Sequence, residues 1–137
     1  MKNILFLCVA NSARSQMAEG LAREMYKDIA NVYSAGSAAT SVNPYAIEVM
    51  AEINIDLNTH TSKSINEIDT GIMDIIITLC ADEICPIVPG TTKHLHWPFT
   101  DPASNDPKIT ANALLARFRT ARDDIKSKLT TLNLNPS

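Results

Sequence analysis

The segment KNILFLCVANSARS, residues 2–15, joins an apolar run, a loop of small residues and the start of a predicted helix. Residues 3–8 form a short apolar run that stops abruptly at small and polar residues. This pattern is typical of a buried parallel strand and too short for a helix of three turns. The run predicts a strand that ends at Cys8, followed by a loop that closes at Arg14.

A helix is predicted immediately after this loop. Met17, Leu21 and Met25 fall on one helix face, and Ser15 is the predicted N-cap. The loop therefore lies between the carboxyl end of a strand and the amino end of a helix. In open α/β sheets this crevice binds ligands, and unpaired N–H groups and the helix dipole favour an anion there.

Cys8 and Arg14 stand at the two ends of this expected anion site. The helix dipole and a guanidinium both stabilise a thiolate, and arginine offers a planar fork for a tetrahedral oxyanion. The arrangement indicates a cysteine nucleophile inside an anion cradle. The alternative from the residues alone is a small buried cysteine with no chemistry.

Composition excludes several classes of protein. The chain has 137 residues, 45% apolar and 20% charged, which predicts one domain over residues 1–137. A net charge of −3 without a basic cluster argues against nucleic-acid binding. Three cysteines are too few, and odd in number, for a disulfide framework, so we expect a reducing, cytoplasmic compartment.

The amino terminus briefly imitates an export signal, because Lys2 precedes an apolar run from Ile4 to Ala10. The run is at the short limit for a signal core and leads directly into the loop, so we interpret it as the first strand. No later stretch approaches the roughly 18 apolar residues that a membrane span needs. We therefore expect no membrane association.

Strands and helices alternate along the rest of the chain, which favours an α/β fold with a mostly parallel sheet. Glycine ends a second predicted strand, and an Asn-Pro pair begins a second helix. The predicted elements are a strand at 32–36, a helix from Asn43, a polar loop at 60–65, a buried strand at 74–80, a strand at 94–99 and an amphipathic helix from Ile109 to about Leu132.

Three further residues are predicted at the same edge of the sheet as Cys8. Cys80 ends the buried strand, Cys85 follows in a loop that contains prolines, and Asp101 follows the next strand. If residues 81–85 form a helical turn, Cys80 and Cys85 lie about 7.5 Å apart along its axis and bond only after unwinding. Asp101 is a candidate general acid; the alternative is an aspartate that forms a turn before Pro102.

The run CVANSARSQMAEG, residues 8–20, resembles the signature of the low-molecular-weight tyrosine phosphatase superfamily, and more closely that of its thioredoxin-coupled arsenate reductases. The resemblance implies a three-layer α/β sandwich with a central four-stranded sheet flanked by helices. It implies Cys8 as nucleophile and Asp101 as acid, with Ser15 stabilising the thiolate. The substrate-binding loop would comprise Val9, Ala10, Asn11, Ser12, Ala13 and Arg14.

The same resemblance implies a supporting network behind the loop, which in some relatives surrounds a monovalent cation such as potassium. The residues concerned are Asn11, Glu19, Ser34, Thr61 and Lys63. Lys63 is a candidate substitute for the cation. The alternative, left open, is that Ser34, Thr61 and Lys63 are ordinary loop residues.

The cysteines separate the two branches of the superfamily. A phosphatase needs no cysteine beyond Cys8, and its relatives tend to carry aromatic residues where this chain has Ala103 and Ser104. Arsenate reduction needs a second thiol to attack the first and a third to carry the disulfide away. We therefore expect reduction of arsenate, with phosphate or sulfate as analogues, through Cys8, Cys80 and Cys85 and with thioredoxin as reductant. Phosphomonoester hydrolysis is the alternative, and weak phosphatase activity is compatible with reduction.

Two expectations concern what the protein binds. Zinc held by Cys80, Cys85, His94 and His96 is disfavoured, because their spacing differs from usual zinc sites. We expect no metal and no tightly bound cofactor, and we expect a monomer.

The chain departs from the family in the spacing of its last two cysteines. Only four residues separate Cys80 from Cys85, fewer than the family often has.

Overall fold

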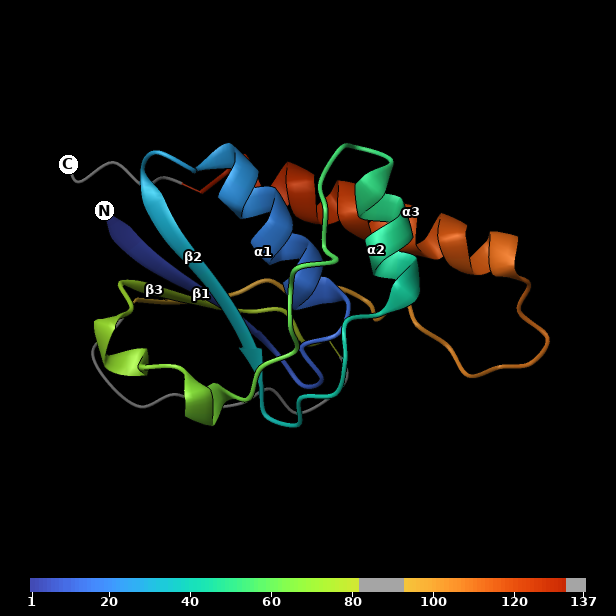
Figure 1. Ribbon diagram of the computed structural model, residues 1–137, viewed down its shortest axis with the longest axis horizontal. Coiled ribbons are helices and arrows are strands. Elements are labelled where there is room, and N and C mark those ends of the chain that lie inside the picture. The colour runs from blue at the N-terminus through green and yellow to red at the C-terminus, as the bar shows by residue number, and fades with distance from the viewer. Residues whose placement is uncertain (82–92, 133–137) are drawn as a thin grey trace.

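The computed structural model describes residues 1–81 and 93–132. The apolar run at the amino terminus forms β1, Lys2–Cys8, as predicted. β1 pairs on one side with β2, Ala30–Gly36, and on the other with β3, Ile75–Thr78; β4, Lys93–His96, pairs with β3. All three pairings are parallel, which confirms the predicted sheet and gives the order β2-β1-β3-β4 (Figure 1).

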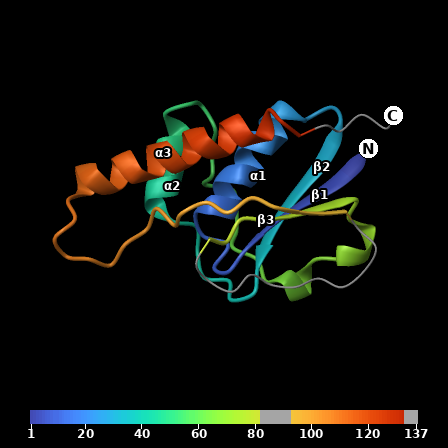
Figure 2. The ribbon, with the colours of Figure 1, turned by 180° about the vertical axis from the view of Figure 1, so that it is seen from behind.

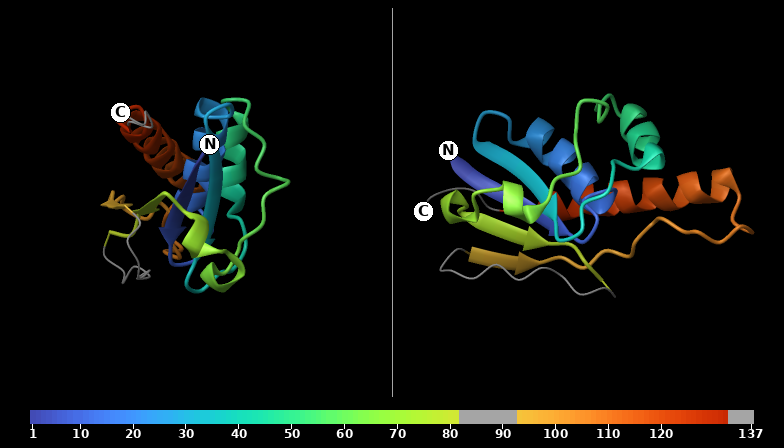
Figure 3. Two further views of the ribbon diagram at one scale, coloured as in Figure 1. Left: turned by 90° about the vertical axis from the view of Figure 1, so that its left-hand side faces the viewer. Right: turned by 60° about the horizontal axis from the view of Figure 1, so that its bottom comes forward.

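In the described part of the chain, three α-helices cover one face of this sheet. They are α1, Arg14–Met25, α2, Pro44–Ala51, and α3, Ala111–Leu129. α1 lies against β1 and β2, and α2 and α3 pack against α1 and each other (Figures 2 and 3). Two short 3-10 helices, η1 at Ile65–Glu67 and η2 at Thr70–Ile72, lie between β2 and β3 in the chain. The predicted α/β sandwich is confirmed.

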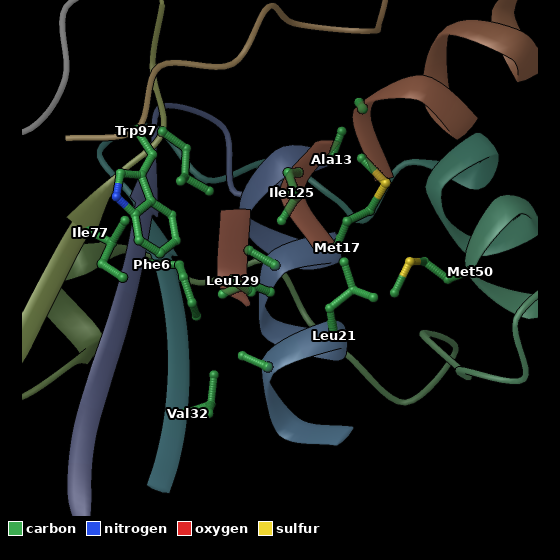
Figure 4. Close-up of a cluster of buried hydrophobic side chains, with 14 of the residues drawn as sticks. Phe6, Ala13, Met17, Leu21, Val32, Met50, Ile77, Trp97, Ile125 and Leu129 are labelled. Atoms are coloured by element: carbon green, nitrogen blue, oxygen red, sulfur yellow. The ribbon is translucent and has the colours of Figure 1, made fainter. Parts of the chain in front are cut away.

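Alternation of side chains along β1 divides the core into two clusters. Ile4 and Phe6 face the helices, whereas Leu5 and Leu7 face the side where Ile65 and Ile68 pack. Figure 4 shows the larger cluster, in which side chains of the sheet, α1 and α3 meet. Because β1 is buried on both faces, its carboxyl end and Cys8 have a fixed position in the molecule.

The predicted helix starts and strand ends are partly right. Asn43 caps α2, since its Oδ1 accepts a hydrogen bond from the Tyr45 amide at 2.8 Å. The strand predicted to reach Phe99 ends at His96. The Trp97 and Phe99 amides still donate to the Thr78 and Leu79 carbonyls, but these acceptors are one residue apart instead of two, so the regular ladder register is lost after His96. In the described residues no helix is long and apolar enough to cross a membrane.

Gly36 connects the sheet to the loop after Cys8. A Cβ built on Gly36 would lie 2.3 Å from the carbonyl oxygen of Val9 and 2.9 Å from the amide nitrogen of Asn11. Both are backbone atoms, so neither can rotate away. The last residue of β2 must therefore be glycine if the loop is to keep this path.

We predict that Gly36→Ala lowers the free energy of unfolding by about 1–3 kcal/mol, because the added methyl overpacks the loop. Urea unfolding followed by circular dichroism measures the loss. Gly71→Ala is the matched control, because its Cβ would meet only the Asp69 Oδ1 atom of an exposed side chain, at 3.1 Å. Its expected effect is within about 0.5 kcal/mol. Equal stability of Gly36→Ala and wild type would contradict this packing.

Candidate active site

Cys8 is the last residue of β1 and is 2% exposed. Its Sγ lies 2.8 Å from the hydroxyl oxygen of Ser15, which is buried in the first turn of α1. Ser15 is therefore not the N-cap, and that prediction was wrong: Ala13 occupies the cap position and makes no side-chain capping bond. The reason is that the Ser15 hydroxyl contacts Cys8 and Asn11 instead.

The loop between Cys8 and α1 turns its carbonyl groups outward. The Val9 carbonyl accepts from the Ala38 amide at 2.9 Å, and the Ala10 carbonyl accepts from the Ser62 hydroxyl at 2.9 Å. The Asn11 carbonyl accepts from the Gln16 side-chain amide at 3.2 Å, and the Ser12 carbonyl accepts from the Asn43 amide at 3.0 Å. In a trans peptide the N–H points opposite to the C=O. The N–H groups of residues 10–13 therefore point inward, and within the described chain none of them donates to another protein group.

These inward amides border a small cavity of 130 Å³. At about 30 Å³ per water molecule, this is the space of roughly four waters, which is the scale of one tetrahedral oxyanion. The cavity is lined by Cys8, Ala10, Ser12, Ala13, Arg14, Asp101 and Ala103. The structure thus brings the predicted thiol, the predicted arginine, the predicted acid and the loop to one place.

Arg14 and Asp101 both line the cavity and lie close to each other. The Arg14 side chain is 6% exposed, donates from Nη1 to the Phe99 carbonyl at 3.0 Å and places Nη2 3.8 Å from Asp101 Oδ2. The Asp101 side chain is 49% exposed and accepts from the Ala103 amide at 3.0 Å. Arg14 therefore contacts both the cavity and the segment that carries the candidate acid.

Asn11 fixes the shape of the loop from behind. Its φ is 48°, in the left-handed region that asparagine tolerates better than most residues. Its side-chain amide donates to the hydroxyls of Ser15 and Ser34 at 2.8 and 3.0 Å. Its Oδ1 accepts from the Lys63 amide at 2.8 Å. These bonds join the loop to α1, β2 and the segment before η1.

Glu19 is the charged centre of this network and is 1% exposed. Ser34 donates to one carboxylate oxygen at 2.7 Å, and the His60 Nδ1 atom lies 2.9 Å from the other. Burial alone raises the pKa of Glu19, but the hydrogen bonds from His60 and Ser34 and the charges of Lys63 and Arg23 outweigh it. The pKa of Glu19 therefore lies below its ordinary value, and the buried carboxylate is ionised.

Two members of the network were not predicted as site residues. Gln16 donates to Asn11 Oδ1 at 3.0 Å and to the Thr61 carbonyl at 2.9 Å, and its Oε1 lies 3.1 Å from His60 Nδ1. Because His60 Nδ1 faces oxygen acceptors of both Gln16 and Glu19, it carries the proton. Gln16 stands in the quoted signature and His60 starts the polar loop, but nothing local in the sequence joins residues 44 positions apart.

Cys80 lies at the same edge of the sheet as Cys8. In the parallel pair of β1 and β3, Leu7 stands opposite Thr78, and the Leu79 amide donates to the Leu7 carbonyl at 2.9 Å. Cys80 therefore follows one residue beyond the position beside Cys8. It is 1% exposed and disulfide-bonded, whereas Cys8 is free. Cys85 lies outside the described residues.

The zinc hypothesis gains no support from the residues described. A disulfide-bonded Cys80 offers no thiolate to a metal, and His96 Nδ1 lies 2.8 Å from the Thr78 hydroxyl. Within residues 1–81 and 93–132 no group of three potential ligands is placed to hold a metal ion.

A cysteine at the end of a parallel strand, a ring of inward amides, a buried arginine and a nearby aspartate define a class of protein. These features suit an enzyme that attacks a tetrahedral oxyanion with a thiolate. The model of the low molecular weight phosphotyrosine protein phosphatase family matches residues 3–134, and the chain belongs to this family.

Within the family, the chain is similar to bacterial arsenate reductases. It is 44% identical over 130 residues to arsenate reductase 2 of Staphylococcus saprophyticus, covering 93% of each chain. It is 42% identical over 135 residues to the arsenate reductase of Staphylococcus xylosus, covering 97% of each. A solved arsenate reductase in its phosphate-binding state superposes with a TM-score of 0.81 at 32% identity, covering 95% of each chain.

The buried charge of Glu19 predicts a pH dependence of stability. Its pKa is lowered from about 4.5 in the folded protein, so its contribution is complete above that pH. The contribution is lost as the pH falls through the folded pKa. We expect Glu19→Gln to lower the free energy of unfolding by about 2 kcal/mol at pH 7, because its buried partners lose a charged acceptor. The difference from wild type should shrink as the pH falls below about 4.5.

Glu24→Gln is the matched control, because Glu24 is an exposed residue of the same helix. Urea titrations at several pH values measure both variants. A difference between wild type and Glu19→Gln that is constant down to the lowest pH would refute the ionised carboxylate.

Proposed function

We propose that this protein reduces arsenate to arsenite, with Cys8 as nucleophile and with Cys80 and Cys85 as the thiols that remove the oxidising equivalent. The observation that carries the proposal is the position of Cys80, which follows β3 at the same sheet edge where Cys8 ends β1. A second sulfur beside an anion cradle is what a two-electron reduction requires.

The first step uses the cavity. Arsenate accepts hydrogen bonds from the inward amides of the loop and from Arg14, and the Cys8 thiolate attacks arsenic. Ser15, 2.8 Å from the sulfur, donates a hydrogen bond to the thiolate. Asp101 gives its proton to the departing oxygen, which leaves as water, and a Cys8–arsenate adduct results.

The second step transfers electrons. The Cys80 thiolate attacks the Cys8 sulfur, a Cys8–Cys80 disulfide forms, and the sulfur–arsenic bond breaks. The electron pair of that bond stays with arsenic, which leaves as arsenite. Arsenic is reduced by two electrons, and two thiols are oxidised to one disulfide.

The third step restores the nucleophile. Cys85 attacks Cys80, which releases Cys8 as a thiolate and forms a Cys80–Cys85 disulfide. A dithiol protein, thioredoxin, reduces that disulfide in the cytoplasm.

Lys63 takes the place of a monovalent cation in this proposal. Its Nζ donates to the Thr61 carbonyl at 2.8 Å and lies 3.6 Å from Glu19 Oε1. These oxygens, with those of Asn11 and Ser34, could replace the hydration shell of a potassium ion, as carbonyl oxygens do in potassium channels. Because the ammonium already neutralises the buried carboxylate, no potassium ion is required.

Phosphomonoester hydrolysis is the second candidate, since Cys8, Arg14 and Asp101 would also cleave a phosphate ester. Ala103 lines the cavity where an aromatic side chain would grip a substrate ring. A weak phosphatase activity is expected beside the reductase activity.

We predict that wild type oxidises NADPH steadily when mixed with arsenate, thioredoxin and thioredoxin reductase. Cys85→Ser should lose steady turnover by at least about 100-fold but release one arsenite per enzyme, because only the last exchange is blocked. Cys8→Ser and Cys80→Ser should lose turnover as well. NADPH absorbance and arsenite quantification give the two readouts.

Aryl phosphate hydrolysis in the same variants distinguishes the two functions. Vigorous hydrolysis that persists in Cys80→Ser and Cys85→Ser, without arsenate-dependent oxidation of NADPH, would replace the reductase proposal by the phosphatase.

The role of Lys63 predicts a weak response to potassium. Replacing sodium by potassium at constant ionic strength should change wild-type turnover by less than about two-fold, because the lysine charge is already in place. Lys63→Ala should be slower and regain activity with potassium, whereas the exposed control Lys27→Ala should behave as wild type. A strong potassium response of the wild type removes Lys63 from this role.

A further inference from the structure

The segment that carries Asp101 is held to the protein after β4 by hydrogen bonds and by the packing of Phe99 and Ala103 against the core. The Trp97 amide donates to the Thr78 carbonyl at 2.8 Å, and the Phe99 amide donates to the Leu79 carbonyl at 3.1 Å. Arg14 contacts the Phe99 carbonyl, as described above. Beyond Phe99 the backbone leaves the sheet and runs as an extended loop to the start of α3 (Figures 1 and 2).

A cavity separates this segment from α3. It measures about 480 Å³, with residues 98–102 on one wall and Ala116, Arg117, Thr120, Ala121 and Asp124 of α3 on the other. Asp101 lines both this cavity and the smaller one beside Cys8. Asp101 therefore lies between two cavities, and its side chain is half exposed although Pro102 beside it is buried.

One side chain of α3 spans the gap to that strip. Arg117 Nη2 donates to the main-chain carbonyl of Asp101 at 3.2 Å. The carboxylate of Asp101 is engaged on its other side by the Ala103 amide and faces Arg14 Nη2 at 3.8 Å. Arg117 thus holds the backbone of the acid, and Arg14 and the Ala103 amide orient its carboxyl group.

We propose that Arg117 is a positioning residue for the acid: its hydrogen bond to the Asp101 carbonyl holds the carboxyl group over the cavity that receives the oxyanion. The inference rests on the proposed function, in which Asp101 protonates the departing oxygen. Arg117 does not line the Cys8 cavity, so its loss should slow the chemical step without weakening capture of the anion.

The test is single-turnover arsenite formation at saturating arsenate without thioredoxin, together with the arsenate dissociation constant. Arg117→Ala should lower the single-turnover rate about five-fold, the effect of one hydrogen bond, and leave the dissociation constant within about two-fold. Arg117→Lys should recover part of the rate, because an ammonium can still donate to the carbonyl.

Arg119→Ala is the matched control. Arg119 lies on the same helix and carries the same charge, but its guanidinium contacts Glu52 at 2.7 Å instead of the acid segment. Its single-turnover rate should equal that of wild type. A loss in Arg119→Ala equal to that in Arg117→Ala would mean that removing any α3 arginine slows the enzyme, and would overturn the proposal.

The double variant Asp101→Asn, Arg117→Ala isolates the positioning effect. Asp101→Asn should slow the step by about 100-fold, and adding Arg117→Ala should then change nothing, because no acid remains to be positioned. A further five-fold loss in the double variant overturns the inference alone. A wild-type rate in Asp101→Asn refutes the acid itself, and the inference falls with that part of the proposed function.

Discussion

The left-handed backbone of Asn11 is the constraint on which the site depends. With φ at 48°, the chain turns so that carbonyl groups on both sides of Asn11 face the surrounding protein and the amides face the cavity. Such a conformation costs roughly 1 kcal/mol or more for a residue with a side chain. The four neighbours of its side chain, Ser15, Ser34, Gln16 and Lys63, hold it there.

The same network explains why a carboxylate is buried behind an anion site. Glu19 is ionised, yet the hydrogen bonds of Ser34 and His60 and the ammonium of Lys63 surround it. A buried charge with good partners adds little net stability. Removal of one partner, however, leaves a buried charge without compensation, which is strongly destabilising. The partners of Glu19 therefore hold the loop of residues 9–13 in one conformation.

Much of the fold was predictable because it follows from local patterns. The apolar runs of β1 and β3 and the periodicity of α1 and α3 are visible within short windows of sequence. The predicted end of β4 lies three residues too late, because the alternation from His94 to Phe99 does not show that the pairing register with the β3 segment is lost after His96.

The site was predictable only where chemistry and local pattern coincide. Cys8 and Arg14 stood out because a strand, a loop and a helix start surround them. The prediction of Ser15 as N-cap was wrong because its hydroxyl contacts the Cys8 sulfur. Cys8 lies seven positions earlier, and the N-cap preference of serine gives no information about such a contact. Gln16 and His60 were missed for a similar reason, since their partners lie in distant segments.

In the proposed reaction, the sulfurs of Cys8 and Cys80 form a disulfide at one edge of one sheet. The most direct measurement traps that step: reduced Cys85→Ser is mixed with one equivalent of arsenate, blocked with iodoacetamide and mapped by mass spectrometry. We predict an arsenate-dependent disulfide that joins the peptides of Cys8 and Cys80. Both cysteines recovered alkylated, with and without arsenate, would contradict it.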